Sequence, residues 1–144
     1  MHSPLLQSII ARHDYPLIGE DDLEAFASTH EHVVLFFAGD ADRLTESNDV
    51  AVVLPELLGV FGEVLFPAVV RRDDERALQR RFRFNAYPAL VFLRGGEYLG
   101  TIQRIRDWSD YLREIPEILG REPSDPPPFR LPDGCAVPAA GEAN

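Results

Sequence analysis

Asn85-Ala86-Tyr87-Pro88-Ala89-Leu90-Val91-Phe92-Leu93-Arg94-Gly95-Gly96 is the stretch of this 144-residue sequence that decides its fold. An X-Pro turn leads into an apolar run of strand length, and a glycine pair follows, which is a hairpin signal. We therefore expect strands at about 89–94 and 97–103, joined by a tight turn. This hairpin would form an antiparallel edge of a sheet.

The segments upstream alternate between helical and strand patterns. Two apolar runs, 32–38 and 65–70, have strand length, and strands that are apolar on both faces belong inside a covered sheet. Helical spacing of apolar residues or acidic N-terminal caps predict helices over 4–12, over 21–29, over 50–61, after Asp73-Asp74-Glu75 and from Asp107 to about 119. Residues 39–49 are polar and are predicted as a loop. Pro55 is expected to kink its helix or delay its start.

This order of elements predicts an α/β fold. Strands that alternate with helices indicate a mixed sheet with helices on both faces, a three-layer sandwich. We expect one domain over residues 1–120. From Gly120 onward six prolines and three glycines occur with few large apolar groups, so residues 121–144 are predicted to be an extended or disordered tail.

The charge is unevenly distributed along the chain. The net charge is −10, and residues 14–63 hold twelve Asp and Glu with Arg43 as the single cation, whereas residues 64–121 carry a net +3. An acidic half argues against nucleic acid as a partner and for a basic one; the alternative is that the acidity only maintains solubility. No apolar run is long enough to span a membrane and no signal peptide is recognisable, so we expect a cytoplasmic protein.

Cysteine is nearly absent. Cys135, within the Pro-rich segment, is the only one in the sequence, which excludes an intrachain disulfide framework. An intermolecular disulfide is possible in principle, but an inert thiol is the favoured interpretation for a cytoplasmic chain.

From about residue 30 to 119 the chain resembles thioredoxins. Phe36-Phe37-Ala38 matches the strand end before their active site, and Tyr87-Pro88 matches their cis-proline turn. Counted onward from Ala38, the two active-site cysteines would fall near Ala41 and Leu44, and the assisting carboxylate at Leu35. The resemblance therefore implies a thioredoxin-like fold whose redox chemistry has been lost.

A closer resemblance covers nearly the whole domain. The chain is similar to the HyaE/HoxO/HupG family of hydrogenase expression proteins, which are thioredoxin-like and lack Cys-x-x-Cys. The residues that carry this resemblance are Val33-Val34-Leu35, Asp40, Arg43, Glu46, Asp49, Arg81-Phe82, Phe84, Tyr87-Pro88-Ala89, Val91-Phe92, Gly95-Gly96 and Asp107-Trp108. It implies a cytoplasmic assembly factor for uptake NiFe-hydrogenase, which holds the small-subunit precursor through its twin-arginine signal peptide. Other hydrogenase assembly factors are further possible partners.

The resemblance also indicates a candidate peptide site. Asp40, Asp42, Glu46 and Asp49 lie on the segment that replaces the redox site, where their carboxylates would accept hydrogen bonds from guanidinium groups. Tyr87 and Pro88 would border a groove that binds an extended peptide. The alternative is that these acids serve solubility and helix capping.

No catalytic set is evident, and we expect neither a cofactor nor an enzyme. An enzyme with another nucleophile would depend on Thr45 or Ser47, but no histidine follows His32 to activate either. His30-Glu31-His32 is too small a set for a typical zinc site. The arginines at 71, 72, 80, 81 and 83 either pair with nearby acids or dock an acidic protein. A redox-inactive docking domain for an unrelated protein remains the main alternative function.

Overall fold

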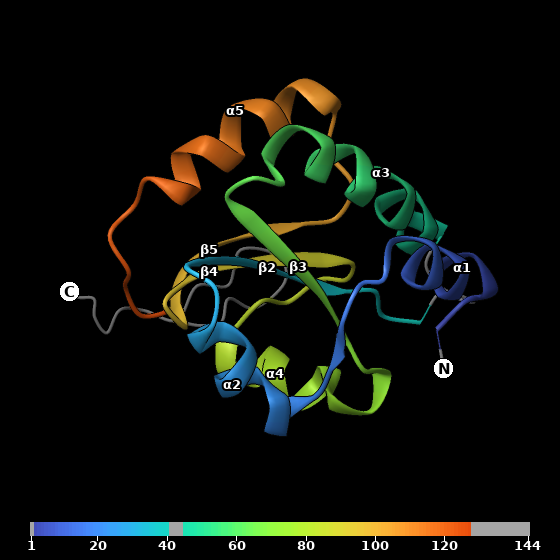
Figure 1. Ribbon diagram of the computed structural model, residues 1–144, viewed down its shortest axis with the longest axis horizontal. Helices are drawn as coiled ribbons and strands as arrows, with labels where there is room; N and C mark the ends of the chain where they lie inside the picture. The colour runs from blue at the N-terminus through green and yellow to red at the C-terminus, as the bar shows by residue number, and fades with distance from the viewer. Residues whose placement is uncertain (1, 41–44, 128–144) are drawn as a thin grey trace.

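A mixed five-stranded sheet lies at the centre of the protein, in the order β1-β3-β2-β4-β5 (Figure 1). The computed structural model describes residues 2–40 and 45–127. Strand β2 (His32–Phe37) is central, parallel to β3 (Leu65–Val70) and antiparallel to β4 (Ala89–Arg94). The sheet ends in β1 (Leu17–Ile18), parallel to β3, and in β5 (Glu97–Gln103), antiparallel to β4.

Helices cover both faces of this sheet. In Figure 1, α3 (Thr45–Phe61) and α5 (Trp108–Leu119) lie above it, and α2 (Leu23–Ser28) and α4 (Glu75–Phe82) lie below it. Helix α1 (Pro4–His13) lies beside α3 at the right and packs into the same core cluster as α3 and α5. Two 3-10 turns, Glu20–Asp22 and Arg72–Asp74, lead into α2 and α4. The predicted α/β fold, a mixed sheet between two helical layers, is therefore confirmed.

The alternation of side chains along β2 divides the core in two. Val34 and Phe36 join the cluster under α1, α3 and α5, and Val33, Leu35 and Phe37 join the cluster over α2 and α4. Successive side chains of a strand point to opposite faces, so an uninterrupted apolar run is what a strand covered on both sides requires. The sequence therefore predicted this strand correctly, except that it ends at Phe37.

The hairpin and the turn before it also agree with the sequence. The strands span 89–94 and 97–103 as predicted, and Gly95 and Gly96 adopt positive φ angles of 58° and 85°. The Tyr87-Pro88 peptide bond is cis, as the resemblance implied.

The predicted loop over 39–49 was wrong in its second half. Helix α3 begins at Thr45 and runs through Pro55 to Phe61, so Pro55 neither delays its start nor ends it. The reason lies at the start of the helix, where the buried Ser47 hydroxyl donates to the Ala38 carbonyl. Ser3 donates to the Asn48 side chain at 2.8 Å, which ties the same turn to α1. These are tertiary contacts that apolar spacing does not reveal.

Strand β1 was not predicted, because it has two residues. Its register pairs Leu17 with Val69 and Ile18 with Val70. The region predicted as a helix over 21–29 is a 3-10 turn followed by a short α-helix that ends at Ser28.

Trp108 does not lie on the core face of the last helix. It is the first residue of α5 and is 43% exposed, whereas Tyr111, Ile115 and Ile118 are buried. The buried stripe of α5 therefore begins at Tyr111, one turn after the first residue of the helix.

The first residues beyond α5 run along the edge strand β5. The Ser124 amide donates to the Tyr98 carbonyl at 3.0 Å, and the Arg83 guanidinium donates to the Pro126 carbonyl at 3.1 Å. Residues 121–127 therefore lie against the hairpin without forming a helix or strand. The rest of the predicted tail, with Cys135, lies outside the described residues.

Candidate functional site

An open cleft lies at the end of β2, where the active site of a thioredoxin would be. Its volume is about 850 Å³, and eight residues line it: Gly39, Asp40, Arg72, Asp73, Glu75, Arg76, Gln79 and Tyr87. Three separate segments contribute: the turn after β2, the start of α4, and the turn that contains the cis peptide bond. Of the six residues proposed from the sequence, Asp40 and Tyr87 line this cleft, and Pro88 adjoins it.

Glu75 lies at the bottom of the cleft and was not predicted as a site residue. It is 2% exposed, and one of its carboxylate oxygens accepts from the Gly39 amide at 3.1 Å, while the other pairs with Arg72. Burial raises the pKa of Glu75, and the hydrogen bonds from Gly39 and Arg72 oppose that shift. The sequence suggested only a helix cap, because nothing in Asp73-Asp74-Glu75 indicates which carboxylate turns inward.

Tyr87 lines the cleft from the turn that contains the cis peptide bond. Its hydroxyl donates to the Gln79 side chain at 3.0 Å, and Gln79 in turn donates to the Phe84 carbonyl at 2.9 Å. Burial, followed by the negative charge of Glu75, raises the pKa of Tyr87 to about 12. Tyr87 therefore presents a neutral phenol, which its hydrogen bond to Gln79 holds in place.

Glu46 does not reach the cleft as a free acceptor. Arg104 donates through Nε to both carboxylate oxygens of Glu46 at 3.1 Å, and its Nη2 makes a further short contact. The Ile105 amide donates to the same carboxylate at 2.9 Å. These contacts, Arg104 first, lower the pKa of Glu46. The carboxylate expected to bind a partner's guanidinium already binds one of this chain's own.

Of the other two predicted acids, only Asp49 can be placed. Asp49 is exposed on α3 and does not line the cleft, and Asp42 lies outside the described residues. Ser47 is buried and bonded to the Ala38 carbonyl, so its hydroxyl is not presented at the surface. The charged residues that line the cleft come largely from the 3-10 turn Arg72–Asp74 and the start of α4, with Asp40 from the predicted acidic segment.

The arginines assigned to pairing or docking are partly engaged within the chain. Arg72 pairs with Glu75, Arg71 with Asp22 at 3.1 Å, and Arg81 with Glu24 at 3.5 Å. No helix in the described part of the chain is long and apolar enough to cross a membrane.

The fold and the cleft define a thioredoxin-like domain without a thiol pair. A chain from a study of the thiol-resolving mechanism of yeast mitochondrial 1-Cys peroxiredoxin shares this fold, with a TM-score of 0.60, 13% identity, and coverage of 73% of this chain and 96% of that one. At that identity the likeness concerns the fold alone.

The chain belongs to the family of the hydrogenase-1 expression protein HyaE, whose model matches residues 5–111. It is 46% identical over 132 residues to the hydrogenase expression/formation protein HoxO of Azotobacter vinelandii, covering 92% of this chain and 87% of that protein. It is 41% identical over 119 residues to HupG of Rhizobium leguminosarum bv. viciae, covering 80% of each.

A solved structure supports the same family. The crystal structure of HupG from Rhodopseudomonas palustris CGA009, described as a hydrogenase expression/formation protein, is 41% identical to this chain. The TM-score is 0.53, and the match covers 72% of this chain and 94% of that one. The family resemblance inferred from the sequence is therefore confirmed.

Proposed function

We propose that this protein is a non-catalytic assembly factor for hydrogenase that holds the small-subunit precursor through its twin-arginine signal peptide. The observation that carries the proposal is the open cleft beside the cis Tyr87-Pro88 turn, in a chain with no cysteine before Cys135. Membership in a family of hydrogenase expression proteins supplies the pathway. The proposal requires a cytoplasmic protein, because a signal peptide is met before export.

The rim of the cleft suits a peptide that carries arginines. Asp73 is exposed and Asp40 is half-buried, and their carboxylates can accept from guanidinium groups. Arg76 is exposed on the same rim and can donate to carbonyl groups of an extended peptide backbone. Glu75 and Glu46 are engaged internally by Arg72 and Arg104, so they support the site without contacting the peptide.

Titration calorimetry with a synthetic twin-arginine signal peptide tests this function. The variants Asp40→Asn and Asp73→Asn keep the side-chain size and remove the charge. Each should weaken binding about fivefold, since an exposed charge pair contributes up to about 1 kcal/mol. Binding should also weaken as salt rises, because exposed charges are screened over about 10 Å at 0.1 M.

Asp49→Asn is the matched control, since Asp49 is exposed but lies away from the cleft. Its affinity for the peptide should equal that of the wild type. If Asp40→Asn and Asp73→Asn also bind like the wild type, or if replacing both peptide arginines by glutamine changes nothing, the cleft is not the binding site.

A further inference from the structure

A second groove lies at the other end of the sheet, against the outer edge of β3. Its volume is about 470 Å³, and it forms where the link between α1 and β1, the end of α2, the second half of α3 and the start of β3 meet. Its lining includes Tyr15, Phe26, His30, Leu58, Phe66 and Pro67. We call it the β3-edge groove. It shares no residue with the cleft at the end of β2.

The groove exists because two prolines end the pairing of β1 with β3. The Val69 amide donates to the Pro16 carbonyl at 2.8 Å, and the Arg71 amide donates to the Ile18 carbonyl at 2.8 Å, so the odd-numbered residues of β3 face β1. Two residues earlier on β3, Pro67 has no N–H that could donate to the segment before β1. Pro16 likewise has no N–H that could donate to the Pro67 carbonyl. By the same alternation the carbonyl groups of Leu65 and Pro67 face the groove. The Leu65 N–H faces the same way, so this edge offers two acceptors and one donor, and it lacks the Pro67 donor that a full added strand would need.

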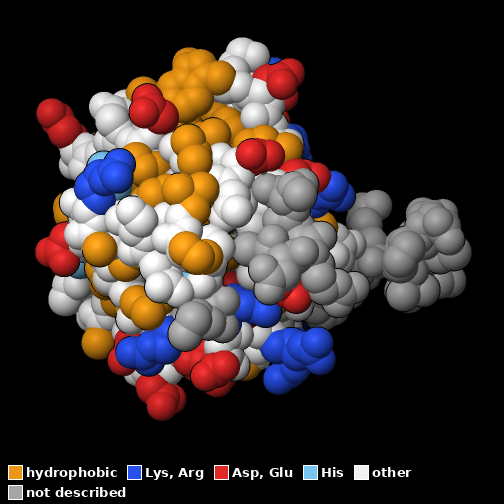
Figure 2. Space-filling view, turned by 90° about the vertical axis from the view of Figure 1, so that its right-hand side faces the viewer, with side chains coloured by type: hydrophobic (Ala, Val, Ile, Leu, Met, Phe, Trp, Pro, Cys, Tyr) orange, Lys and Arg blue, Asp and Glu red, His pale blue; other side chains and the backbone are white. Residues whose placement is uncertain are grey.

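Aromatic rings form one wall of the groove. The His30 ring lies 4.3 Å from the Phe66 ring and 4.8 Å from the Phe26 ring, measured between centroids. Phe66 is nevertheless 41% exposed and its neighbour Val64 is 53% exposed. Figure 2 shows the face that carries α1, where hydrophobic side chains are interspersed with charged ones.

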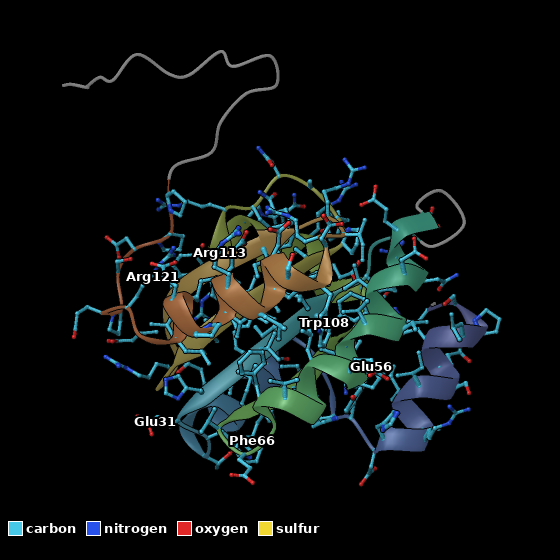
Figure 3. All side chains as sticks on the ribbon, turned by 90° about the horizontal axis from the view of Figure 1, so that it is seen from above. Glu31, Glu56, Phe66, Trp108, Arg113 and Arg121 are labelled. Atoms are coloured by element: carbon cyan, nitrogen blue, oxygen red, sulfur yellow. The ribbon has the colours of Figure 1, made fainter. Side chains whose placement is uncertain are left out.

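The surroundings of the groove are acidic. All of its lining residues fall between His13 and Pro67, and the described residues from 13 to 70 include no arginine or lysine. Asp14 lines the groove, and Glu31, Glu56 and Glu63 are exposed next to lining residues in the sequence. Glu31 and Glu56 are labelled in Figure 3. Arg12 is also exposed, next to the lining residue His13, so these four acids outnumber the neighbouring arginine by four to one. Within the described part of the chain, these four carboxylates take part in no ion pair.

We propose that the β3-edge groove docks an apolar peptide segment of a partner protein that carries an arginine. The apolar side chains would pack on Phe66, Phe26 and Leu58, and the guanidinium would meet Asp14 and the carbonyl groups of the β3 edge. A guanidinium is the matching group because it has five donors and no acceptor and stacks on aromatic rings. This docking site is separate from the cleft and does not depend on the function proposed for it.

The test uses the full-length, nitrogen-15-labelled protein and a short synthetic peptide with one central arginine flanked by leucines. Titration followed by amide chemical shifts should perturb Gly59, Gly62 and Phe66. Phe66→Ser and Asp14→Asn should each weaken binding at least about fivefold. A peptide with glutamate in place of the arginine should bind at least about tenfold more weakly.

Matched controls come from exposed residues elsewhere. Leu112→Ser on α5, where Leu112 is 38% exposed, and Asp49→Asn on α3 should leave the affinity unchanged. Asp40→Asn and Asp73→Asn should also leave it unchanged, which separates this site from the cleft. Loss of signal-peptide binding in those two variants tests the proposed function alone.

Three results would overturn the proposal. The first is a set of shifts that maps to Gly39 and Tyr87 rather than to the β3-edge groove. The second is equal affinity for the arginine and glutamate peptides. The third is self-association of the chain in sedimentation experiments that Phe66→Ser abolishes, because a second copy would then be the occupant.

Discussion

Glu46 and Arg104 join the first turn of α3 to the end of β5 through a two-pronged ion pair. The Arg104 amide also donates to the Pro88 carbonyl at 2.7 Å, so the same residue holds the turn that contains the cis peptide bond. Arg104 adopts a positive φ of 68°, which directs its backbone and side chain toward these two partners. Arg104 therefore fixes the start of α3 relative to the Tyr87-Pro88 turn, which borders the cleft.

Replacing Glu46 by glutamine should lower the melting temperature at neutral pH. Because Arg104 lowers the pKa of Glu46 in the folded state, the pair stabilises the fold above the pKa of the unfolded chain. That stability is lost as the pH falls through the lower, folded-state pKa. The difference in melting temperature between wild type and Glu46→Gln should therefore shrink below about pH 4.

Thermal unfolding at several pH values and salt concentrations checks this expectation. Asp49→Asn serves as the control, since Asp49 is exposed on the same helix. A deficit in Glu46→Gln that is equal at acidic and neutral pH would mean that shape, and not charge, accounts for the loss. The deficit should also shrink in high salt, since both partners reach solvent.

Most of the fold could be predicted from the sequence because its strands are apolar on both faces. The apolar runs that form β2, β3 and β4 have the length and composition of strands that are covered on both faces. Gly95-Gly96 marks the hairpin turn. Strand β1 has two residues, which is too few to show an alternating apolar pattern in the sequence. The start of α3 depends on the buried hydrogen bond from Ser47 to Ala38, which joins residues that a local pattern does not connect.

The candidate site was predicted less completely, because it is built across the sequence. Tyr87 was found from the X-Pro turn and Asp40 from its place after β2. Glu75 and Asp73 come from the start of a distant helix, and their acidic character had a local explanation as a cap. The ion pair of Glu46 with Arg104 could not be predicted, because the two residues lie 58 positions apart in the sequence. Charge alone does not distinguish an internal ion pair from a binding residue.

Gly95→Ala should destabilise the hairpin by about 1–2 kcal/mol. A Cβ at this position would meet nothing within 4 Å, so the cost comes from the positive φ of 58° and not from a clash. Gly95→Asn should cost less, because asparagine tolerates the left-handed region better than alanine. Urea denaturation measures both. Equal losses for the two variants would contradict this explanation.

The protein should show no thiol–disulfide exchange activity. Exchange requires a thiolate that attacks a disulfide, and this chain has only Cys135, with no second cysteine to resolve the mixed disulfide. In an insulin-reduction assay with dithiothreitol, its rate should equal the background rate. Turnover well above background that Cys135→Ser removes would contradict the expectation.

Substitutions of Glu75 test how much its contacts with Gly39 and Arg72 stabilise the protein. Glu75→Ala would leave the buried Gly39 amide without its acceptor and Arg72 without its partner, which should cost about 1–3 kcal/mol. Glu75→Gln keeps an oxygen that can accept from Gly39, so it should cost less at pH 7. Urea denaturation with an unchanged m-value would confirm that the native state alone is affected.

The pH dependence separates the charge of Glu75 from its shape. Because burial raises the folded-state pKa of Glu75, the protonated form contributes stability that is present below the unfolded pKa and is lost as the pH rises through the folded pKa. Glutamine does not titrate, so Glu75→Gln should gain stability relative to the wild type as the pH rises above about 4, the unfolded-state pKa of glutamate. If the stability of Glu75→Gln instead falls relative to the wild type as the pH rises, the ion pair with Arg72 outweighs the cost of burying the carboxylate. Glu75 is then charged in the folded protein.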